Sequence, residues 1–443
     1  MINKNIAFGL LSIVLLGSIF QLNAQETKHV VLISIDGFRS DFYKDPEWAT
    51  ANLKYLAKNG TTAADVRTIF PSVTYPSHTT LVTGTLPESH GIYYNTGVGK
   101  DGKPEGCVYD FNQVKAKTIW QYAKEKGMST ASVSWPVTVN NPYIDYNIPE
   151  IWSFDNPSDR REATREFATP KGLFEEVTEY ATGQMEKDAY NLTSFRMDEN
   201  LGRIASHIIE KYKPNLLTVH FPNTDGAQHK MGREGDYVNR AIANADNAVG
   251  AIYDALERAG ILEETAIIIT GDHGFVTVHT AIAPNIWLKD AGLYEKAFFF
   301  STGGSTFLHL KDKNDTKTLD KVKQLLAQLP FVYQQTFKVI DEKTIRTYKA
   351  DPNTRLALSA ADGYAFSNDA QGEVLQHKVG GKHGYFPDNH NIYTGFVAYG
   401  AGFAKGREIP LLHLEDIMLV IAQLLKIEVK EIDGIAQPGI FEK

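Results

Sequence analysis

The sequence has little cysteine, no excess of positive charge and few long apolar runs. Cys107 is the single cysteine among 443 residues, so no disulfide can form within the chain. The chain has 45 Lys and Arg residues and 53 Asp and Glu residues, which gives it a net charge of −8. That balance argues against a nucleic-acid-binding surface or broad attraction to an anionic membrane. With 43% hydrophobic residues, 35 Gly and 18 Pro, the composition is that of a globular protein.

The longest uncharged apolar run lies at the N-terminus, from Ile6 to Phe20, and it ends in Leu22-Asn-Ala24. This pattern predicts a secretory signal peptide over residues 1–24. The run is shorter than the roughly 20 residues that span a bilayer, and no cysteine follows the cleavage site to carry a lipid. We therefore expect a secreted or periplasmic protein with no membrane anchor after cleavage.

The rest of the chain shows no repeat, no low-complexity tract and no Gly/Ser linker. Apolar β-branched runs alternate with stripes of helical spacing, which predicts an α/β fold with a mostly parallel central sheet flanked by helices on both faces. Residues 25–443 are expected to form one domain with insertions at about residues 137–199 and 301–379, the second a small α/β insertion. The predicted strands are His29–Ile35, Thr130–Ser134, Asn215–His220, Ala266–Thr270 and Ile392–Tyr399.

Carboxylates and imidazoles follow three of these strands, and a further histidine lies in the Gly-rich stretch 380–384. In open α/β sheets, ligands bind beyond the carboxyl ends of the strands, so these side chains should converge on one crevice. Each motif alone has an ordinary reading as a turn or a helix cap. Together they offer three Asp and three His without a thiolate, a set that suits Zn²⁺ and also accepts Mn²⁺ or Co²⁺. The residues are Asp36, Asp225, His229, Asp272, His273 and His383.

Six protein ligands exceed what one catalytic zinc with an open position needs. Two metals close together are a recurring device for displacement at phosphorus. A nucleophile is then required, and Thr74 lies where Pro76 predicts the first turn of a helix. The helix dipole and free amides there favour negative charge. The alternative, that Thr74 only caps the helix, stays open at this level.

These motifs, in this order, resemble the nucleotide pyrophosphatase/phosphodiesterase family of the alkaline phosphatase superfamily. The resemblance covers nearly all of the chain after residue 24. The segments that carry it are Asp36-Gly-Phe-Arg39, Thr74-Tyr-Pro-Ser-His78, Leu81–Gly84, Pro87–Gly91, Asp225 to His229, Gly271–Gly274 and Lys382–Gly384.

The resemblance implies an alkaline-phosphatase-like fold and two Zn²⁺ per chain. One zinc would be held by Asp225, His229 and His383. The other would be held by Asp36, Asp272 and His273, with the oxygen of Thr74 completing the site. Asn95 falls where the family places an amide that hydrogen-bonds a phosphoryl oxygen.

The implied reaction is hydrolysis of a phosphodiester or pyrophosphate bond, with nucleotides as the expected small-molecule substrates, through a phosphothreonine intermediate on Thr74. Trp135-Pro136 stands where related monoesterases carry Lys-x-Arg, which favours a diesterase.

A lipid or choline phosphodiesterase, a phosphomonoesterase and a phosphonoacetate hydrolase remain alternatives on the same core. A non-enzymatic binding protein would need a missing ligand or a missing Thr74, and none is missing. The sequence predicts no oligomeric state.

Aromatic residues near the nucleophile and in the first insertion have two readings. They either stack on a nucleobase or cage a choline ammonium, or they pack the insertion against the core. These residues are Tyr75, Tyr143, Tyr146, Trp152 and Phe154. Arg160, Arg161 and Arg165 are expected to be solvated surface charges.

Overall fold

Eight strands form the central sheet, in the order β17-β2-β16-β8-β1-β7-β5-β6. Five of the seven neighbouring pairs are parallel, and β16 alone runs antiparallel to both of its neighbours. The predicted mostly parallel sheet is confirmed. The strands are β1 (His29–Ile35), β2 (Thr61–Arg67), β5 (Thr130–Val133), β6 (Tyr146–Ile148), β7 (Leu216–Phe221), β8 (Thr265–Thr270), β16 (Phe396–Gly400) and β17 (Arg407–His413).

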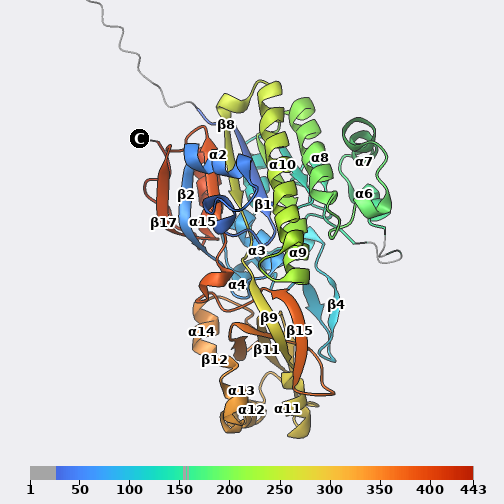
Figure 1. Ribbon diagram of the computed structural model, residues 1–443, viewed down its shortest axis with the longest axis vertical. Coiled ribbons are helices and arrows are strands. Elements are labelled where there is room, and N and C mark those ends of the chain that lie inside the picture. Colours follow the sequence, from blue (N-terminus) through green and yellow to red (C-terminus); the bar gives the residue numbers. More distant parts are fainter. Residues whose placement is uncertain (1–25, 153–155, 157–158, 443) are drawn as a thin grey trace, which may run out of the picture.

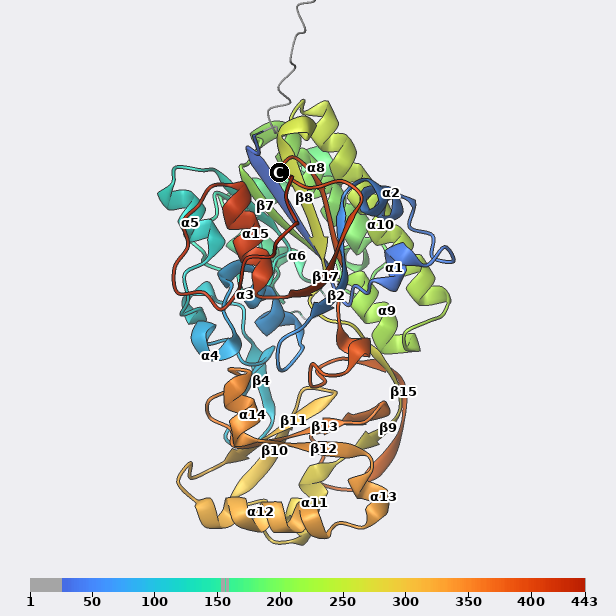
Figure 2. The ribbon, with the colours of Figure 1, turned by 90° about the vertical axis from the view of Figure 1, so that its left-hand side faces the viewer.

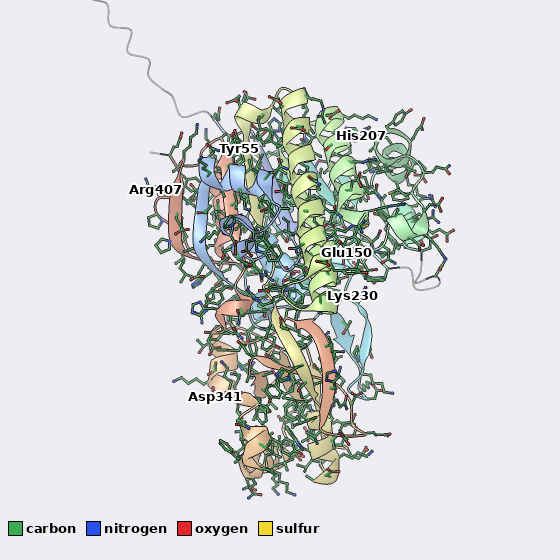
Figure 3. The ribbon with its side chains drawn as sticks, viewed as in Figure 1. Tyr55, Glu150, His207, Lys230, Asp341 and Arg407 are labelled. Carbon is green, nitrogen blue, oxygen red and sulfur yellow. The ribbon has the colours of Figure 1, made fainter. Side chains whose placement is uncertain are left out.

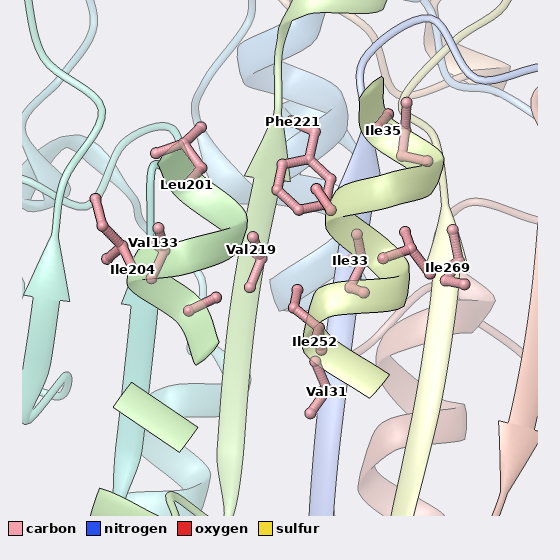
Figure 4. Close-up of a cluster of buried hydrophobic side chains, with 14 of the residues drawn as sticks. Val31, Ile33, Ile35, Val133, Leu201, Ile204, Val219, Phe221, Ile252 and Ile269 are labelled. Carbon is pink, nitrogen blue, oxygen red and sulfur yellow. The ribbon is translucent and has the colours of Figure 1, made fainter. Parts of the chain in front are cut away.

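Helices cover both faces of this sheet, as Figure 2 shows. Side chains alternate along β1, so Val31, Ile33 and Ile35 face one layer of helices while Val30 and Leu32 face the other. The first layer is α2 (Ala51–Asn59), α8 (Met197–Tyr212) and α10 (Asp236–Arg258). Figure 4 shows side chains of α8 and α10 against those of the strands. The second layer is α3 (Thr74–Thr83), α5 (Ile119–Glu125) and α15 (Asp416–Leu424).

A smaller lower lobe hangs from the central sheet on two long strands, β9 (Val276–Ile282) and β15 (Leu375–Lys382) (Figure 1). With β14 (Gly363–Phe366) they form a three-stranded sheet. The lobe also contains an antiparallel sheet in the order β10-β11-β13-β12. Its elements are β10 (Ala297–Ser301), β11 (Ser305–Leu310), β12 (Phe337–Asp341), β13 (Leu356–Ala360), α11 (Pro284–Asp290), α12 (Thr316–Gln328), α13 (Phe331–Gln334) and α14 (Glu342–Thr347).

The two faces of the antiparallel sheet in the lower lobe pack against different parts of the molecule. Phe299 and Leu308 pack with Val322 of α12, which builds the core of the lobe itself. On the opposite face, the ring of Phe307 lies 4.9 Å from that of Phe70. Because Phe70 precedes α3 by four residues, this contact fixes the lower lobe directly beneath the start of that helix.

The computed structural model describes residues 26–152, 156 and 159–442. The predicted signal peptide, residues 1–24, lies outside the described residues. Within them, no helix is long and apolar enough to cross a membrane. Further elements include α4 (Pro87–His90), the hairpin strands β3 (Thr96–Val98) and β4 (Pro104–Cys107), α6 (Arg161–Phe167), α7 (Leu173–Val177) and α9 (Asn223–Met231).

Candidate active site

The carboxyl ends of β1, β7 and β8 meet at one edge of the central sheet. Ser34 of β1 pairs with His220 of β7 on one side and with Thr270 of β8 on the other. The backbone N–H of Asp36 then donates to the carbonyl of Phe221, at 2.9 Å. Asp36, Asp272 and the start of α9 are therefore held at the same level of the sheet, as the strand pattern predicts.

One cluster of ligand-type side chains is deeply buried. Nε2 of His273 lies 3.5 Å from Oδ1 of Asp36 and 3.1 Å from Oδ2 of Asp272. The other carboxylate oxygen of Asp272 accepts the backbone N–H groups of Gly37 and His273, both at 3.0 Å. These two bonds turn Oδ2 toward the imidazole.

The second cluster is more open to solvent. Oδ1 of Asp225 lies 3.3 Å from Nε2 of His229, one helical turn further along α9, and 3.6 Å from Nε2 of His383. His229 donates from Nδ1 to the carbonyl of Gly381, and His383 donates from Nδ1 to that of Ser72. Because a carbonyl can only accept, both rings keep the lone pair of Nε2 facing Asp225, as metal-ligating histidines do.

The two clusters adjoin one another, since the ligand atoms of Asp36, Asp225 and His273 lie within 4.8 Å of one another, and so do those of Asp225, His229 and His383. The rings of His273 and His383 stack at 3.7 Å. Within the described residues, Oδ1 of Asp36, Oδ1 of Asp225, Oδ2 of Asp272 and Nε2 of His273 are buried without a hydrogen-bond partner. Burying such atoms is costly unless they coordinate a cation, so this donor set fits two adjacent zinc ions.

The electrostatics of the pocket agree with that fit. Burial raises the pKa of Asp36 well above its usual range, and the neighbouring Asp225 carboxylate adds to the effect. Burial and the Asp36 carboxylate likewise raise the pKa of Asp272. Burial lowers the pKa of His273 and of His383 well below the usual value, so both rings are neutral and able to ligate a metal.

Thr74 is the first residue of α3, and Val73 occupies the N-cap position before it. The capping alternative for Thr74 therefore does not describe this helix. His78 donates from Nδ1 to the carbonyl of Thr74 at 2.8 Å, and the same nitrogen lies 3.7 Å from Oδ2 of Asp272. Since Ser72 accepts from His383, the short segment around Thr74 touches both clusters.

Asn95 lies beside the same helix start. Its Oδ1 accepts the backbone N–H of Tyr75 at 2.8 Å, which leaves Nδ2 as the group that it can offer to a ligand. The structure thus brings together all eight residues named from the sequence.

Two buried residues behind the site were not predicted. His220 lies 3.2 Å from Oδ2 of Asp36 through Nε2 and 3.0 Å from Oε2 of Glu150 through Nδ1. Oε1 of Glu150 accepts the hydroxyl of Tyr75 at 3.0 Å. Figure 3 shows Glu150 in the part of the molecule built on the central sheet (the upper lobe), at the end that faces the lower lobe. The only sequence signal was a histidine inside a predicted buried strand, where an imidazole needs a polar partner.

The arginines of the first insertion differ from one another. Arg160 is only 1% exposed, donates from Nε to the carbonyl of Ile151 and lies over the ring of Trp152, so its expected place on the surface is wrong. Arg161 pairs with Asp159, and Arg165 forms an ion pair with Glu175 at the surface.

The aromatic residues with two readings mostly pack. Tyr75 is 4% exposed and lies among Ile92, Tyr109 and neighbouring side chains. Tyr146 stacks on Tyr212 at 3.9 Å, and Tyr143 lies against Phe111 at 6.0 Å. Trp152 is half-buried against the Tyr75 cluster, and Phe154 lies outside the described residues.

Residues 30–386 match the family model of type I phosphodiesterase / nucleotide pyrophosphatase. This chain belongs to that family. The resemblance seen in the sequence is confirmed, and phosphodiester hydrolysis is the activity that this family is named for. The metal dependence of the family accords with the two candidate metal-binding groups described above.

Among curated relatives, rat ectonucleotide pyrophosphatase/phosphodiesterase family member 7 is 24% identical over 438 residues, covering 94% of this chain and 87% of that protein. Venom phosphodiesterase 2 of Crotalus adamanteus is 24% identical over 435 residues, covering 91% of this chain but 46% of that protein. The chain thus spans less than half the length of this venom enzyme.

Solved structures share the fold. Murine ectonucleotide pyrophosphatase/phosphodiesterase 5 superposes with a TM-score of 0.68 at 22% identity, covering 92% of this chain and 97% of that one. A structure of its inactive threonine-to-alanine variant in complex with AMP has the same TM-score at 21% identity, covering 93% of this chain and 98% of that one.

Proposed function

We propose that this chain is an exported two-zinc phosphodiesterase that hydrolyses nucleotide diesters or pyrophosphate bonds through a phosphothreonine intermediate. The observation that carries the proposal is the position of Thr74, at the first residue of α3, in a segment that touches both Asp/His clusters. The predicted signal peptide supports export, and the relatives include venom phosphodiesterases.

Asp225, His229 and His383 would hold one zinc, and Asp36, Asp272 and His273 would hold the other together with the Thr74 oxygen. Zinc in these sites supplies Lewis acidity, which lowers the pKa of a coordinated hydroxyl and offsets charge on the phosphoryl group. The buried oxygens without hydrogen-bond partners support this assignment.

The protein's own groups define the two displacements. Oγ1 of Thr74 gives its proton to water and forms a bond to phosphorus as the bond to the leaving group breaks, and the leaving oxygen takes up a proton from water. Nδ2 of Asn95 orients a non-bridging oxygen, and the positive end of the α3 dipole favours the negative charge of the phosphoryl group. Water then attacks phosphorus and restores the Thr74 hydroxyl with its proton.

Preference for a diester follows from the charges available to the phosphoryl group. A monoester dianion needs extra cationic donors, whereas Asn95 is neutral and Trp135 is buried edge-to-face against His78 at 5.0 Å. Two relatives favour nucleotides among the possible diesters. One is the human bis(5'-adenosyl)-triphosphatase, at 23% identity, and the other is the murine protein whose structure contains bound AMP.

A panel of esters on one zinc-loaded preparation tests the proposal. We expect p-nitrophenyl thymidine 5′-monophosphate to be cleaved with at least ~100-fold higher kcat/KM than p-nitrophenyl phosphate, or about 3 kcal/mol. It should also exceed p-nitrophenylphosphocholine and phosphonoacetate. A ratio near one between the first two esters, or a preference for phosphocholine or phosphonoacetate, contradicts the assignment and selects the corresponding alternative.

A further inference from the structure

A cavity of about 690 Å³ lies where the β3–β4 hairpin meets the lower lobe, behind the segment before β3 that carries Asn95. Its walls include Ile92 and Val98 from the upper side and Phe298 and Leu310 from β10 and β11. This volume is within the range of small-molecule sites, which combine apolar walls with a few polar groups. Neither metal cluster contributes a residue to it.

The charged residues of this cavity are mostly basic. Lys100, Lys311 and Lys313 line it, against a single carboxylate, Asp351. That carboxylate is already satisfied, because Oδ2 accepts the hydroxyl of Tyr94 at 2.9 Å and Oδ1 accepts two N–H groups of Asn353 at 2.8 Å. An excess of positive charge beside apolar walls is complementary to an organic anion.

Lys311 and Lys313 do not form strong ion pairs. Lys313 donates to the neutral amide oxygen of Asn353 at 2.6 Å, and Lys311 has its nearest carboxylate, the 90% exposed Glu295, 3.8 Å away. Exposed ion pairs of this kind contribute little, so both ammonium groups can turn to a ligand. Phe298 and His309 stack at 5.4 Å with an angle of 12° between their planes, which shapes one wall for a flat ligand group.

The cavity is also connected to the proposed active site through one residue. Tyr94 and Thr96 line the cavity on either side of Asn95, and Val108 lines it as well. The backbone N–H of Val108 donates to the carbonyl of Asn95 at 3.0 Å, while Asn95 accepts from Tyr75 on the other side. A molecule that shifts these wall residues must therefore shift the amide beside Thr74.

We propose that this cavity binds a small organic anion with a flat apolar part, and that its occupation changes the position of Asn95. The proposal that this cavity binds an anion rests only on its volume, its lysines and its apolar walls. The effect on catalysis rests on the proposed function, in which Asn95 orients the phosphoryl group.

Binding is tested with 1-anilinonaphthalene-8-sulfonate, an aromatic sulfonate, by fluorescence titration of the zinc-loaded protein in excess inorganic phosphate, which competes at the metal clusters. Replacing Lys311 and Lys313 together by Ala should weaken binding about tenfold or more. The matched control replaces Lys289 and Lys323 by Ala, two exposed lysines of the lower lobe that do not line the cavity. An unchanged Kd in the first variant, or an equal loss in the control, overturns the site.

Coupling is tested by diester hydrolysis with and without a saturating concentration of the same probe. We expect kcat/KM to change at least twofold in the wild-type enzyme and to stay constant in the Lys311→Ala/Lys313→Ala variant. Binding without any change in rate, or an equal change in both proteins, overturns the coupling. Failure of the enzyme to cleave any diester would instead contradict the proposed function and leave the binding titration intact.

Discussion

Nε2 of His220 lies 3.2 Å from Oδ2 of Asp36, and the opposite nitrogen of the same ring lies 3.0 Å from Glu150. The imidazole is therefore clamped between a proposed zinc ligand and a buried carboxylate. Burial opposes charge on this ring, but the interaction with Glu150 outweighs it and raises the pKa of His220. This arrangement orients the Asp36 carboxylate from behind.

Removing that clamp should weaken metal binding. We expect His220→Ala to lower zinc affinity by about 10-fold or more, the usual effect of losing a residue that supports a metal ligand. His207→Ala is the matched control, since His207 lies on α8 far from the site (Figure 3) and pairs only with Glu176 among the carboxylates of the described residues. Competition with a chromophoric chelator measures both, and equal affinities in the two variants would show that His220 does not support the metal.

Chelation of the purified protein should abolish diester hydrolysis, and Zn²⁺ should restore it. Elemental analysis should give about two zinc ions per chain, because five ligand-type side chains form two groups that share Asp225, and Asp272 lies 3.1 Å from His273 in the deeper one. Asp225→Asn and Asp272→Asn should each lose metal as well as rate, since the carboxylate charge offsets that of the cation. Full turnover by metal-free protein contradicts the two-metal assignment.

Thr74→Ala should lose nearly all turnover while the chain stays folded and keeps most of its zinc, because three protein ligands remain at that site. Thr74→Ser retains a hydroxyl and should keep part of the rate. Steady-state kinetics, circular dichroism and zinc analysis on the same samples check the three statements. Substantial activity in the Ala variant would mean that water, not Thr74, attacks phosphorus.

Asp198 supplies a pH prediction. It is fully buried on α8, and burial raises its pKa to about 7 from the usual 3.8. The folded state therefore binds a proton more tightly than the unfolded state, so stability falls as the pH rises from about 4 to 7. Asp198→Asn cannot ionise and should escape this loss, which amounts to at most about 4 kcal/mol.

Urea unfolding at two pH values checks this prediction. The gain in the free energy of unfolding from Asp198→Asn should be about 2–3 kcal/mol larger at pH 8 than at pH 5, because most of the titration falls between them. Asp254→Asn, an exposed change on α10, is the control and should show no such difference. Equal gains at both pH values would show that Asp198 is ionised throughout.

Much of the fold was predictable because its central strands are buried on both faces and read as continuous apolar runs. The strands β1, β7 and β8 begin or end within one residue of their predicted bounds. The direction of β16 was not predictable, since antiparallel pairing with β2 and β8 depends on where the chain returns from the lower lobe. The start of that strand was also misplaced, because His390–Ile392 forms a 3₁₀ turn.

The candidate site, like the fold, could be predicted only in part from the sequence. Asp36 and Asp272 directly follow predicted strands, so their convergence follows from strand order. The partnership of His220 with Glu150 joins residues 70 positions apart, and Glu150 lies in a stretch without helical or strand periodicity. The burial of Arg160 likewise depends on Trp152 and the backbone of Ile151, which only the folded insertion brings together.

The stereochemical outcome at phosphorus tests the central claim most directly. A thymidine 5′-phosphorothioate diester of known configuration, hydrolysed in ¹⁸O-labelled water, gives a product whose configuration phosphorus NMR can assign. Attack by Thr74 followed by attack of water is two in-line displacements, so the account predicts net retention. Net inversion would mean a single displacement by water and would contradict the phosphothreonine intermediate.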